Sequence, residues 1–263
     1  MSDDIAVGQT ASPVFRRALA FFYLAVVSAC SVLEDRDGCP CRLTLDMTGV
    51  DEEVVADVNS GGSFHYNGIV DASQETLVLS VPRRGVSVNV LSGDDGQYLE
   101  GVGLMVPEGF ECPPVWMYSS FVWTGGEAAG ERVCLHKNYC GLTIRALGFV
   151  GEPFMFDVTG RVCGYGEDGA PLEGDFRCRV IPDGEGYCHV RLPRQKDESL
   201  RLHVVSGDRL LRSFALGAFL VCSGYDWSAP DLSDAVVELD YADTAVDVRI
   251  GEWSATVDLD VLV

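Results

Sequence analysis

Cysteine offers more potential chemistry than any other residue type in this chain, which has ten cysteines among 263 residues. Thiolates can bind zinc, and the thiols of an exported protein can pair as disulfides. The chain contains no C-x2-C pair, and the CPC spacing of Cys39 and Cys41 suits neither common zinc knuckle, so we predict no metal site. Cys134 and Cys140 could form a disulfide across a tight turn, although sequence alone does not fix the pairing.

Cys30 differs from the other cysteines in what precedes it. Arg16 and Arg17 are followed by ALAFFYLAVV, a run of ten uncharged residues that ends at Val27. A transmembrane helix needs about twenty apolar residues, whereas a run of this length matches the apolar core of a secretory signal peptide. The tetrad VSAC, which ends at Cys30, resembles a bacterial lipobox, in which a signal peptidase cuts before the cysteine and that cysteine carries lipid.

These features predict a lipoprotein signal peptide over residues 1–29, with cleavage between Ala29 and Cys30 and a lipid on Cys30. Residues 30–40 then form a lipidated acidic spacer. A buried N-terminal helix with a free cysteine is the alternative interpretation. With Cys30 lipidated, nine cysteines remain, and an odd number leaves at least one thiol free or paired between molecules.

The charge of the chain argues against one class of partner. The sequence has 40 acidic and 19 basic residues, a formal net charge of −21, and removal of residues 1–29 takes away two of each. Phosphate backbones and anionic lipid surfaces repel so acidic a chain, and we therefore predict no nucleic-acid partner. Attachment to a membrane would then depend on the covalent lipid rather than on a basic patch.

Motifs for catalysis are absent from the sequence, which has no G-x-S-x-G, no H-E-x-x-H and no P-loop. GYGEDG at residues 164–169 matches G-x-G-x-x-G, but no helical pattern follows it and its acidic residues would repel a phosphate. That segment therefore predicts a hairpin turn. We expect no enzyme activity, no cofactor and no small-molecule substrate. The histidines, which lie in or beside strand patterns, are expected to be satisfied or solvent-facing: positions 65, 136, 189 and 203.

Two other groups could bind a ligand. Asp94 and Asp95 could hold calcium, but SGDDGQ is first of all a turn sequence. The stretch WMYSSFVW is rich in aromatic residues, which could stack on sugars if they were exposed, although the apolar residues between them favour packing in a core. The aromatic residues concerned are Trp116, Tyr118, Phe121 and Trp123.

Alternation of apolar and polar residues predicts β-strands along most of the chain. CRLTLDM at 41–47, ETLVLSVP at 75–82 and VSVNVLSG at 86–93 show this pattern, and it restarts after Gly151. The 29 glycines and 11 prolines suit many short strands joined by turns, and only Arg212–Gly224 is predicted to be helical. The sequence therefore predicts an all-β protein with two β-sandwich domains in tandem, at residues 41–150 and 151–263.

The last third of the chain resembles a known family. The segments that carry the resemblance are GYDW at 224–227, DLSD at 231–234, VELDYA at 237–242 and VDVRIGEW at 246–253, supported by LPRQKDESLRLHV at 192–204. Together with the lipobox cysteine and the acidic spacer, they resemble the FimB-type fimbrial anchor lipoproteins of the Bacteroidota-style, or type V, pili. The number of mid-chain cysteines departs from the family pattern.

The resemblance implies that both sandwich domains are transthyretin-like and that the chain is a fimbrial anchor. Such a subunit lies at the base of a fimbria, contacts the first stalk subunit, and is held on the outer face of the outer membrane by the lipid on Cys30. Glu34, Asp35 and Asp37 are similar to the signal that directs these lipoproteins to that face. The alternative is a surface lipoprotein that binds glycans or proteins, such as a tip adhesin, through the stretch from Trp116 to Trp123.

The resemblance also bears on the two ends of the folded chain. Stalk subunits of these pili lose an N-terminal strand to an arginine-specific protease, which opens a groove for a neighbour's strand. Cleavage at Arg36 or Arg42 would separate Cys30 from the rest, so we expect this chain to keep its first strand. The C-terminal segment is then the candidate donor or contact strand, and an ordinary closing strand of the second sandwich is the other interpretation. The candidate contact residues are Ala245, Val246, Val248, Ile250, Trp253, Val257, Leu259, Val261 and Val263.

Overall fold

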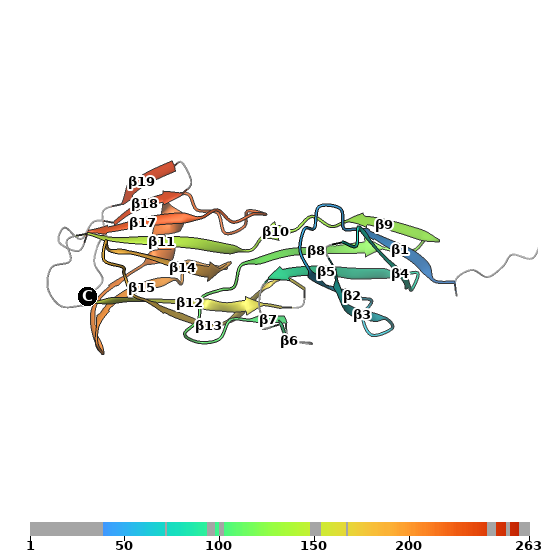
Figure 1. Cartoon of the computed structure of the whole chain (residues 1–263), viewed down its shortest axis with the longest axis horizontal. Helices are drawn as coiled ribbons and strands as arrows, with labels where there is room; N and C mark the ends of the chain where they lie inside the picture. Colours follow the sequence, from blue (N-terminus) through green and yellow to red (C-terminus); the bar gives the residue numbers. More distant parts are fainter. Residues whose placement is uncertain are drawn as a thin grey trace, which may run out of the picture. The chain divides into compact units, whose positions relative to one another are not determined.

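The computed structural model describes residues 39–71, 73–93, 98–99, 103–147, 154–166, 168–240, 246–250 and 253–257. These residues form β-strands for the most part, with one short helix, α2 (Leu216–Cys222), so the all-β prediction is confirmed (Figure 1). The helix is shorter than the predicted Arg212–Gly224 because the residues before it belong to a strand, β16 (Arg209–Phe214), that pairs with its neighbour in a sheet.

Two sheets pack together in the described part that precedes β11 (Tyr139–Leu147), and the strand order of each follows from the hydrogen-bond register. The first has the order β4 (Thr76–Val81), β1 (Cys41–Asp46), β9 (Ala128–Arg132). The second has the order β10 (His136–Lys137), β8 (Val115–Trp123), β5 (Gly85–Gly93), β2 (Val54–Asn59), β3 (His65–Val70). Alternate residues of these strands fill a common core, as successive side chains of a strand point to opposite faces.

The first strand, β1, lies between two neighbours. It pairs antiparallel with β4 and parallel with β9, and Leu43 and Leu45 are fully buried in the core. The amide of Arg42 donates to the carbonyl of Glu127 at 2.9 Å, so hydrogen bonding begins with the first residues of the strand. β1 therefore belongs to its sandwich through both of its edges and its inward face.

The described residues from β11 onward supply most of two further sheets, which enclose a separate core. One has the order β14 (Tyr187–Pro193), β11 (Tyr139–Leu147), β17 (Ala235–Asp240), β18 (Val246–Ile250), β19 (Trp253–Val257). The other has the order β16, β15 (Arg201–Ser206), β12 (Met155–Tyr165), β7 (Gly103–Met105), β6 (Tyr98–Leu99), with β13 (Pro171–Val180) also paired to β12. This is the predicted tandem of two β-sandwiches; the transthyretin-like detail stays a prediction.

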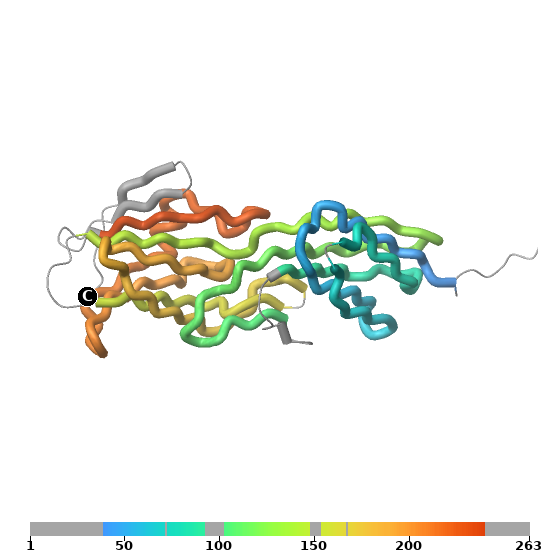
Figure 2. Tube along the Cα trace, viewed as in Figure 1, coloured from blue at the N-terminus to red at the C-terminus, as the bar shows by residue number. Residues whose placement is uncertain are grey.

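The strand pairings bear on where the two sandwiches divide. β11 precedes the predicted boundary at residue 150, yet it pairs with β14 and β17 of the C-terminal sandwich. The chain passes from β10 directly into β11 (Figure 2). We therefore propose that the division falls between β10 and β11. One strand from the N-terminal half of the chain, β7, pairs with β12 and so lies in a sheet of the C-terminal sandwich.

Candidate functional site

Several of the predicted site residues lie outside the described residues: Ala29, Cys30, Ala245, Leu259, Val261 and Val263. The described part of the C-terminal candidate segment lies in its own sheet, where β18 pairs with β17, and β19 pairs with β18. Val246, Val248 and Ile250 are thus ladder residues of β18. Trp253 and Val257 are the first and last residues of β19, which forms the edge of this sheet among the described strands.

The aromatic stretch of β8 divides into two parts. Trp116 and Tyr118 are half-buried, and the hydroxyl of Tyr118 donates to Oε1 of Glu131. Burial, reinforced by that hydrogen bond, raises the pKa of Tyr118 to about 12. Phe121 and Trp123 are instead 67% and 72% exposed, so the expectation of core packing is wrong for both. They differ from their neighbours because they lie on the outer face of the sheet, where no second sheet covers them.

Glycines hold the two exposed rings in place. A Cβ on Gly85 would lie 1.7 Å from Cζ of Phe121, and a Cβ on Gly125 would lie 2.6 Å from Nε1 of Trp123. Each ring therefore rests on main chain that only glycine leaves open, an arrangement that covers otherwise exposed backbone. The opposite side of each ring faces solvent, so both residues present apolar surface in a fixed position.

Two of the segments that carry the family resemblance, LPRQKDESLRLHV and GYDW, meet at Arg194. Its Nη1 donates to the carbonyls of Trp227 at 2.5 Å and Ala229 at 2.7 Å, and its Nη2 donates to that of Pro230 at 3.0 Å. Its Nε donates to Oδ1 of Asn138 at 2.6 Å. Burial lowers the pKa of Arg194 from its ordinary value. One guanidinium thus holds the GYDW segment and the loop that follows it against the connection between β10 and β11.

Two aspartates of the DLSD segment strengthen this connection. Asp231 accepts hydrogen bonds from the amide of Lys137 at 2.8 Å and from Nδ1 of His136 at 3.1 Å, and these bonds lower its pKa. Asp234 accepts from Nζ of Lys137 at 2.5 Å and from the amide of Gly141 at 2.7 Å. Because β10 pairs with β8 of the N-terminal sandwich, the loop fixes the C-terminal sandwich to its neighbour.

An open pocket of about 540 Å³ lies beside this connection. Trp116 and Leu135 supply apolar surface, while Lys137 and Asp231 supply charge, with Asp51 and Glu52 adding carboxylates from the segment before β2. An aromatic ring beside carboxylates and an ammonium group can stack on the apolar face of a sugar and bind its hydroxyls. Among the surfaces of the described residues, this junction pocket is the best candidate site for a small polar ligand.

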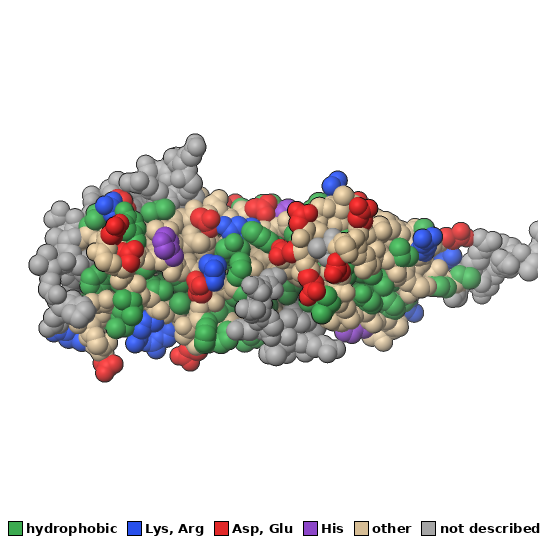
Figure 3. Space-filling view, in the orientation of Figure 1, with side chains coloured by type: hydrophobic (Ala, Val, Ile, Leu, Met, Phe, Trp, Pro, Cys, Tyr) green, Lys and Arg blue, Asp and Glu red, His purple; other side chains and the backbone are tan. Residues whose placement is uncertain are grey.

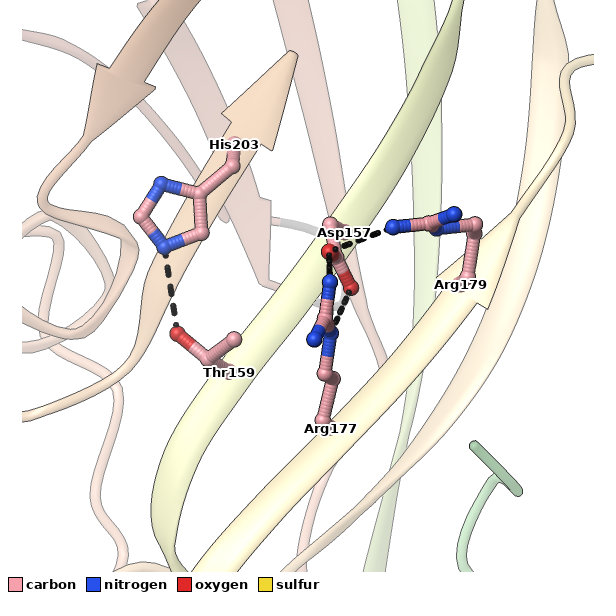
Figure 4. Close-up of polar contacts among 5 residues, drawn as sticks. All are labelled: Asp157, Thr159, Arg177, Arg179 and His203. Carbon is pink, nitrogen blue, oxygen red and sulfur yellow. Dashed lines mark hydrogen bonds and ion pairs between the residues drawn. The ribbon is translucent and has the colours of Figure 1, made fainter. Parts of the chain in front are cut away.

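An ion cluster centred on one buried carboxylate lies in the C-terminal sandwich (Figure 4). The carboxylate of Asp157, on β12, accepts from Nε of Arg177 at 3.0 Å and from Nη2 of Arg179 at 3.2 Å, both on β13. Burial alone would raise the pKa of Asp157, but the two guanidiniums outweigh it and lower the pKa. Nearby, Nε2 of His203 lies 3.2 Å from the hydroxyl of Thr159, and burial lowers the pKa of His203. The cluster joins neighbouring strands. The prediction of a satisfied histidine holds only in part for His203, because its Nδ1 is buried without a hydrogen-bond partner among the described residues.

The described cysteines are all free thiols. Cys134 is exposed and Cys140 is buried, so the disulfide considered for this pair is not formed. Burial raises the pKa of Cys112 and of Cys140 to about 12. Within the described ranges, no three side chains of the metal-binding types converge, and no helix has the length and apolar character to cross a bilayer.

Sequence reasoning missed the central position of Arg194 and the pocket beside Trp116. The only available signal for Arg194 was its place in LPRQKDESLRLHV, where it directly follows the proline that ends a strand. Its partners are main-chain carbonyls, which leave no mark in an amino-acid sequence.

Comparison with protein-family models and with curated proteins finds no match. Solved structures do match. A proposed polysaccharide-binding protein from Bacteroides thetaiotaomicron is 11% identical and matches with a TM-score of 0.63, over 82% of this chain and 98% of its own. The fimbrial anchor protein Mfa2 from Porphyromonas gingivalis is 11% identical, with a TM-score of 0.62 over 83% of this chain and 99% of its own.

A third match, a proposed adhesin from Bacteroides thetaiotaomicron, is 14% identical and has a TM-score of 0.55, over 84% of this chain and 99% of its own. Identities this low show a shared fold alone. At that level the resemblance to fimbrial anchor proteins is confirmed, because a fimbrial anchor is among the proteins with this fold.

Proposed function

We propose that this chain is a non-catalytic fimbrial anchor subunit that a lipid on Cys30 tethers to the outer membrane and that contacts the first stalk subunit. The observation that carries the proposal is the shared fold with the fimbrial anchor Mfa2, which extends over 99% of that protein. The VSAC tetrad that ends at Cys30 supports the lipid attachment. The acidic spacer that follows supports placement on the outer face.

The position of β1 supports retention of the first strand. Cleavage after Arg42 would divide β1 and remove Cys41, whose side chain is 1% exposed in the core, from the rest of the sheet. The strand is hydrogen-bonded along both edges, and proteases need an extended segment free of such pairing. The folded chain therefore resists a cut after Arg42, one of the cuts that would detach it from its lipid.

The C-terminal sheet offers a place for the stalk subunit. An edge strand has unpaired main-chain groups that can pair with a strand from another chain. We propose that the stalk subunit binds at the β19 edge. Deletion of Ser254–Val263 is expected to abolish co-purification of the stalk subunit, while a cooperative thermal unfolding transition shows that the remainder is still folded. Undiminished co-purification would refute the contact.

The decisive experiment concerns the lipid. A Cys30→Ser variant in the native cell is expected to release fimbriae into the medium, measured as fimbrial protein in medium and on cells. Cys39→Ser is the matched control, because Cys39 is an exposed thiol in the same part of the chain and should leave fimbriae attached. Fimbriae that stay on the cells in the Cys30→Ser variant would contradict the anchor function.

The second candidate is a glycan-binding surface lipoprotein, which the junction pocket beside Trp116 favours. In this case Trp116→Ala abolishes retention on immobilised polysaccharide. Trp123→Ala, which removes an exposed ring outside the pocket, leaves retention unchanged. Retention by neither the parent chain nor the variants would leave the anchor as the sole candidate.

A further inference from the structure

The first strand of the described chain begins at one end of the N-terminal sandwich, where the ends of three other strands also lie. Cys41, the first residue of β1, pairs with Val81, the last residue of β4. Gly85, the first residue of β5, pairs with Trp123, the last residue of β8. We call this end the N-terminal pole and define it by Arg42, Arg83, Arg84, Phe121 and Trp123.

The pole is basic in a strongly acidic chain. The segments that meet here, 40–42, 82–85 and 123–128, contain Arg42, Arg83 and Arg84 but a single acid, Glu127, while the chain as a whole has a net charge of −21. Figure 3 shows basic side chains at this end of the N-terminal sandwich. A positive end on a negative body orients the molecule, with the pole toward an anionic surface and the body away from it.

The pole also carries the most exposed aromatic side chains of β8. Phe121 is 67% exposed and Trp123 is 72% exposed, and each rests on the main chain of a glycine, Gly85 or Gly125. Tryptophan beside arginine is the pairing that membrane–water interfaces favour, since the ring fits the headgroup layer while the guanidinium contacts phosphate. A large exposed apolar surface with a basic rim marks an interaction site.

The turn that presents the arginines is held in shape. Thr124 is fully buried, and its hydroxyl donates to the carbonyl of Pro82 at 2.6 Å. The same oxygen accepts from the amide of Arg84 at 3.2 Å, and that amide also lies 2.8 Å from the carbonyl of Pro82. The turn and the end of β8 therefore form one fixed unit, so binding at the pole needs little ordering of the main chain.

We propose that the N-terminal pole is a membrane-contact surface, where Phe121 and Trp123 enter the headgroup layer of an anionic bilayer and the arginines contact its phosphates. This inference rests on the proposed lipidation of Cys30. Cys41 follows Cys30 by eleven positions, and a chain of that length reaches at most about 40 Å, so the lipid keeps the pole near the bilayer. The net charge of the chain opposes contact with an anionic bilayer. The three arginines at the pole nevertheless permit contact at this end.

The test uses the full chain isolated from native membranes with its N-terminal modification, incorporated into phosphatidylcholine vesicles with or without phosphatidylglycerol. Brominated acyl chains in these vesicles quench the fluorescence of any tryptophan that enters the bilayer. We expect Trp123→Phe to lose most of the quenching seen in the parent chain. Trp116→Phe is the matched control, because Trp116 is half-buried at the other end of β8, and it should keep that quenching.

Charge reversal tests the arginines. Arg83→Glu with Arg84→Glu is expected to lower the ratio of docked to undocked chain in anionic vesicles by about fivefold per arginine removed, and to have little effect in neutral ones. Arg161→Glu, an exposed arginine of the C-terminal sandwich, is the control and should change nothing. If the acidic spacer, with Glu34, Asp35 and Asp37, covered the arginines instead, reversal would leave quenching unchanged and would overturn their assigned role.

Mass spectrometry of the N-terminus separates failure of this inference from failure of the anchor function. A lipid on Cys30 together with the same quenching in Trp123→Phe as in the parent chain would overturn the membrane contact alone. An N-terminus without lipid would overturn both. The pole could instead bind a second copy of this chain, and sedimentation in detergent tests that alternative. A dimer that Trp123→Ala dissociates would make the pole an interface between two copies and would refute the proposal.

Discussion

Arg194→Ala tests whether one side chain joins the two sandwiches. The substitution removes four hydrogen bonds, three of them to the carbonyls of Trp227, Ala229 and Pro230 and one to Asn138. A hydrogen bond from a charged donor contributes about 1.5–3 kcal/mol, but the carbonyls regain water once the loop opens, so the contributions do not add. We expect the free energy of unfolding to fall by about 3–4 kcal/mol, which corresponds to a melting temperature lower by roughly 10 °C in a chain of this size.

The measurement is chemical unfolding, combined with hydrogen exchange of residues 226–231. Arg194→Lys should recover only part of the loss, because an ammonium group cannot reach the same fork of acceptors. The control is Arg201→Ala, whose guanidinium donates to the nearby carbonyls of Glu198 and Leu200, each at 3.1 Å. Equal losses for Arg194→Ala and Arg201→Ala, or unchanged exchange in the loop, would refute the assignment of Arg194 as the joining residue.

Three further predictions concern the interior. Because the pKa of Asp157 is lowered in the folded chain, its carboxylate stabilises the fold above the ordinary carboxylate pKa of about 3.9, and this stabilisation is lost as the pH falls through the folded-state pKa. Asp157→Asn should therefore flatten the acid side of a plot of unfolding midpoint against pH. Gly103→Ala should lower the free energy of unfolding, measured by chemical denaturation, by about 1–3 kcal/mol more than Gly61→Ala does. Both glycines have a positive φ, but a Cβ on Gly103 would lie 2.1 Å from the carbonyl oxygen of Tyr165, whereas a Cβ on Gly61 would meet no atom within 4 Å. Iodoacetamide on the native chain, read by mass spectrometry, should label the exposed thiols only, and labelling of the buried six before unfolding would contradict the burial described above. The thiols expected to react are Cys39, Cys134 and Cys222.

Local patterns predicted the strands well, because alternation depends only on residues two apart. VSVNVLSG lies within β5, and CRLTLDM contains β1. The GYGEDG segment forms the predicted hairpin turn, where the amide of Gly166 donates to the carbonyl of Ala170 at 2.8 Å. Gly169 has a φ of +74° in this turn, a conformation that glycine adopts readily.

Features that depend on distant pairing could not be predicted in this way. The parallel pairing of β1 with β9, and of β11 with β17, joins segments far apart in sequence, and alternation does not reveal which strand lies beside which. The exposure of Phe121 and Trp123 escaped prediction for a related reason. Both occur at regular strand spacing among apolar residues, and only the arrangement of the sheets shows which face lacks a cover.

The position of β1 has a mechanical consequence for a tethered chain. A load applied through the N-terminus pulls β1 along its own axis, past β4 on one side and β9 on the other. In this shear geometry the hydrogen bonds of both ladders bear the force together, whereas a strand peeled from the end of a sheet breaks them one after another. If the chain is the anchor proposed above, its strand nearest the lipid is thus arranged to resist pulling, as the attachment of a fibre under flow requires.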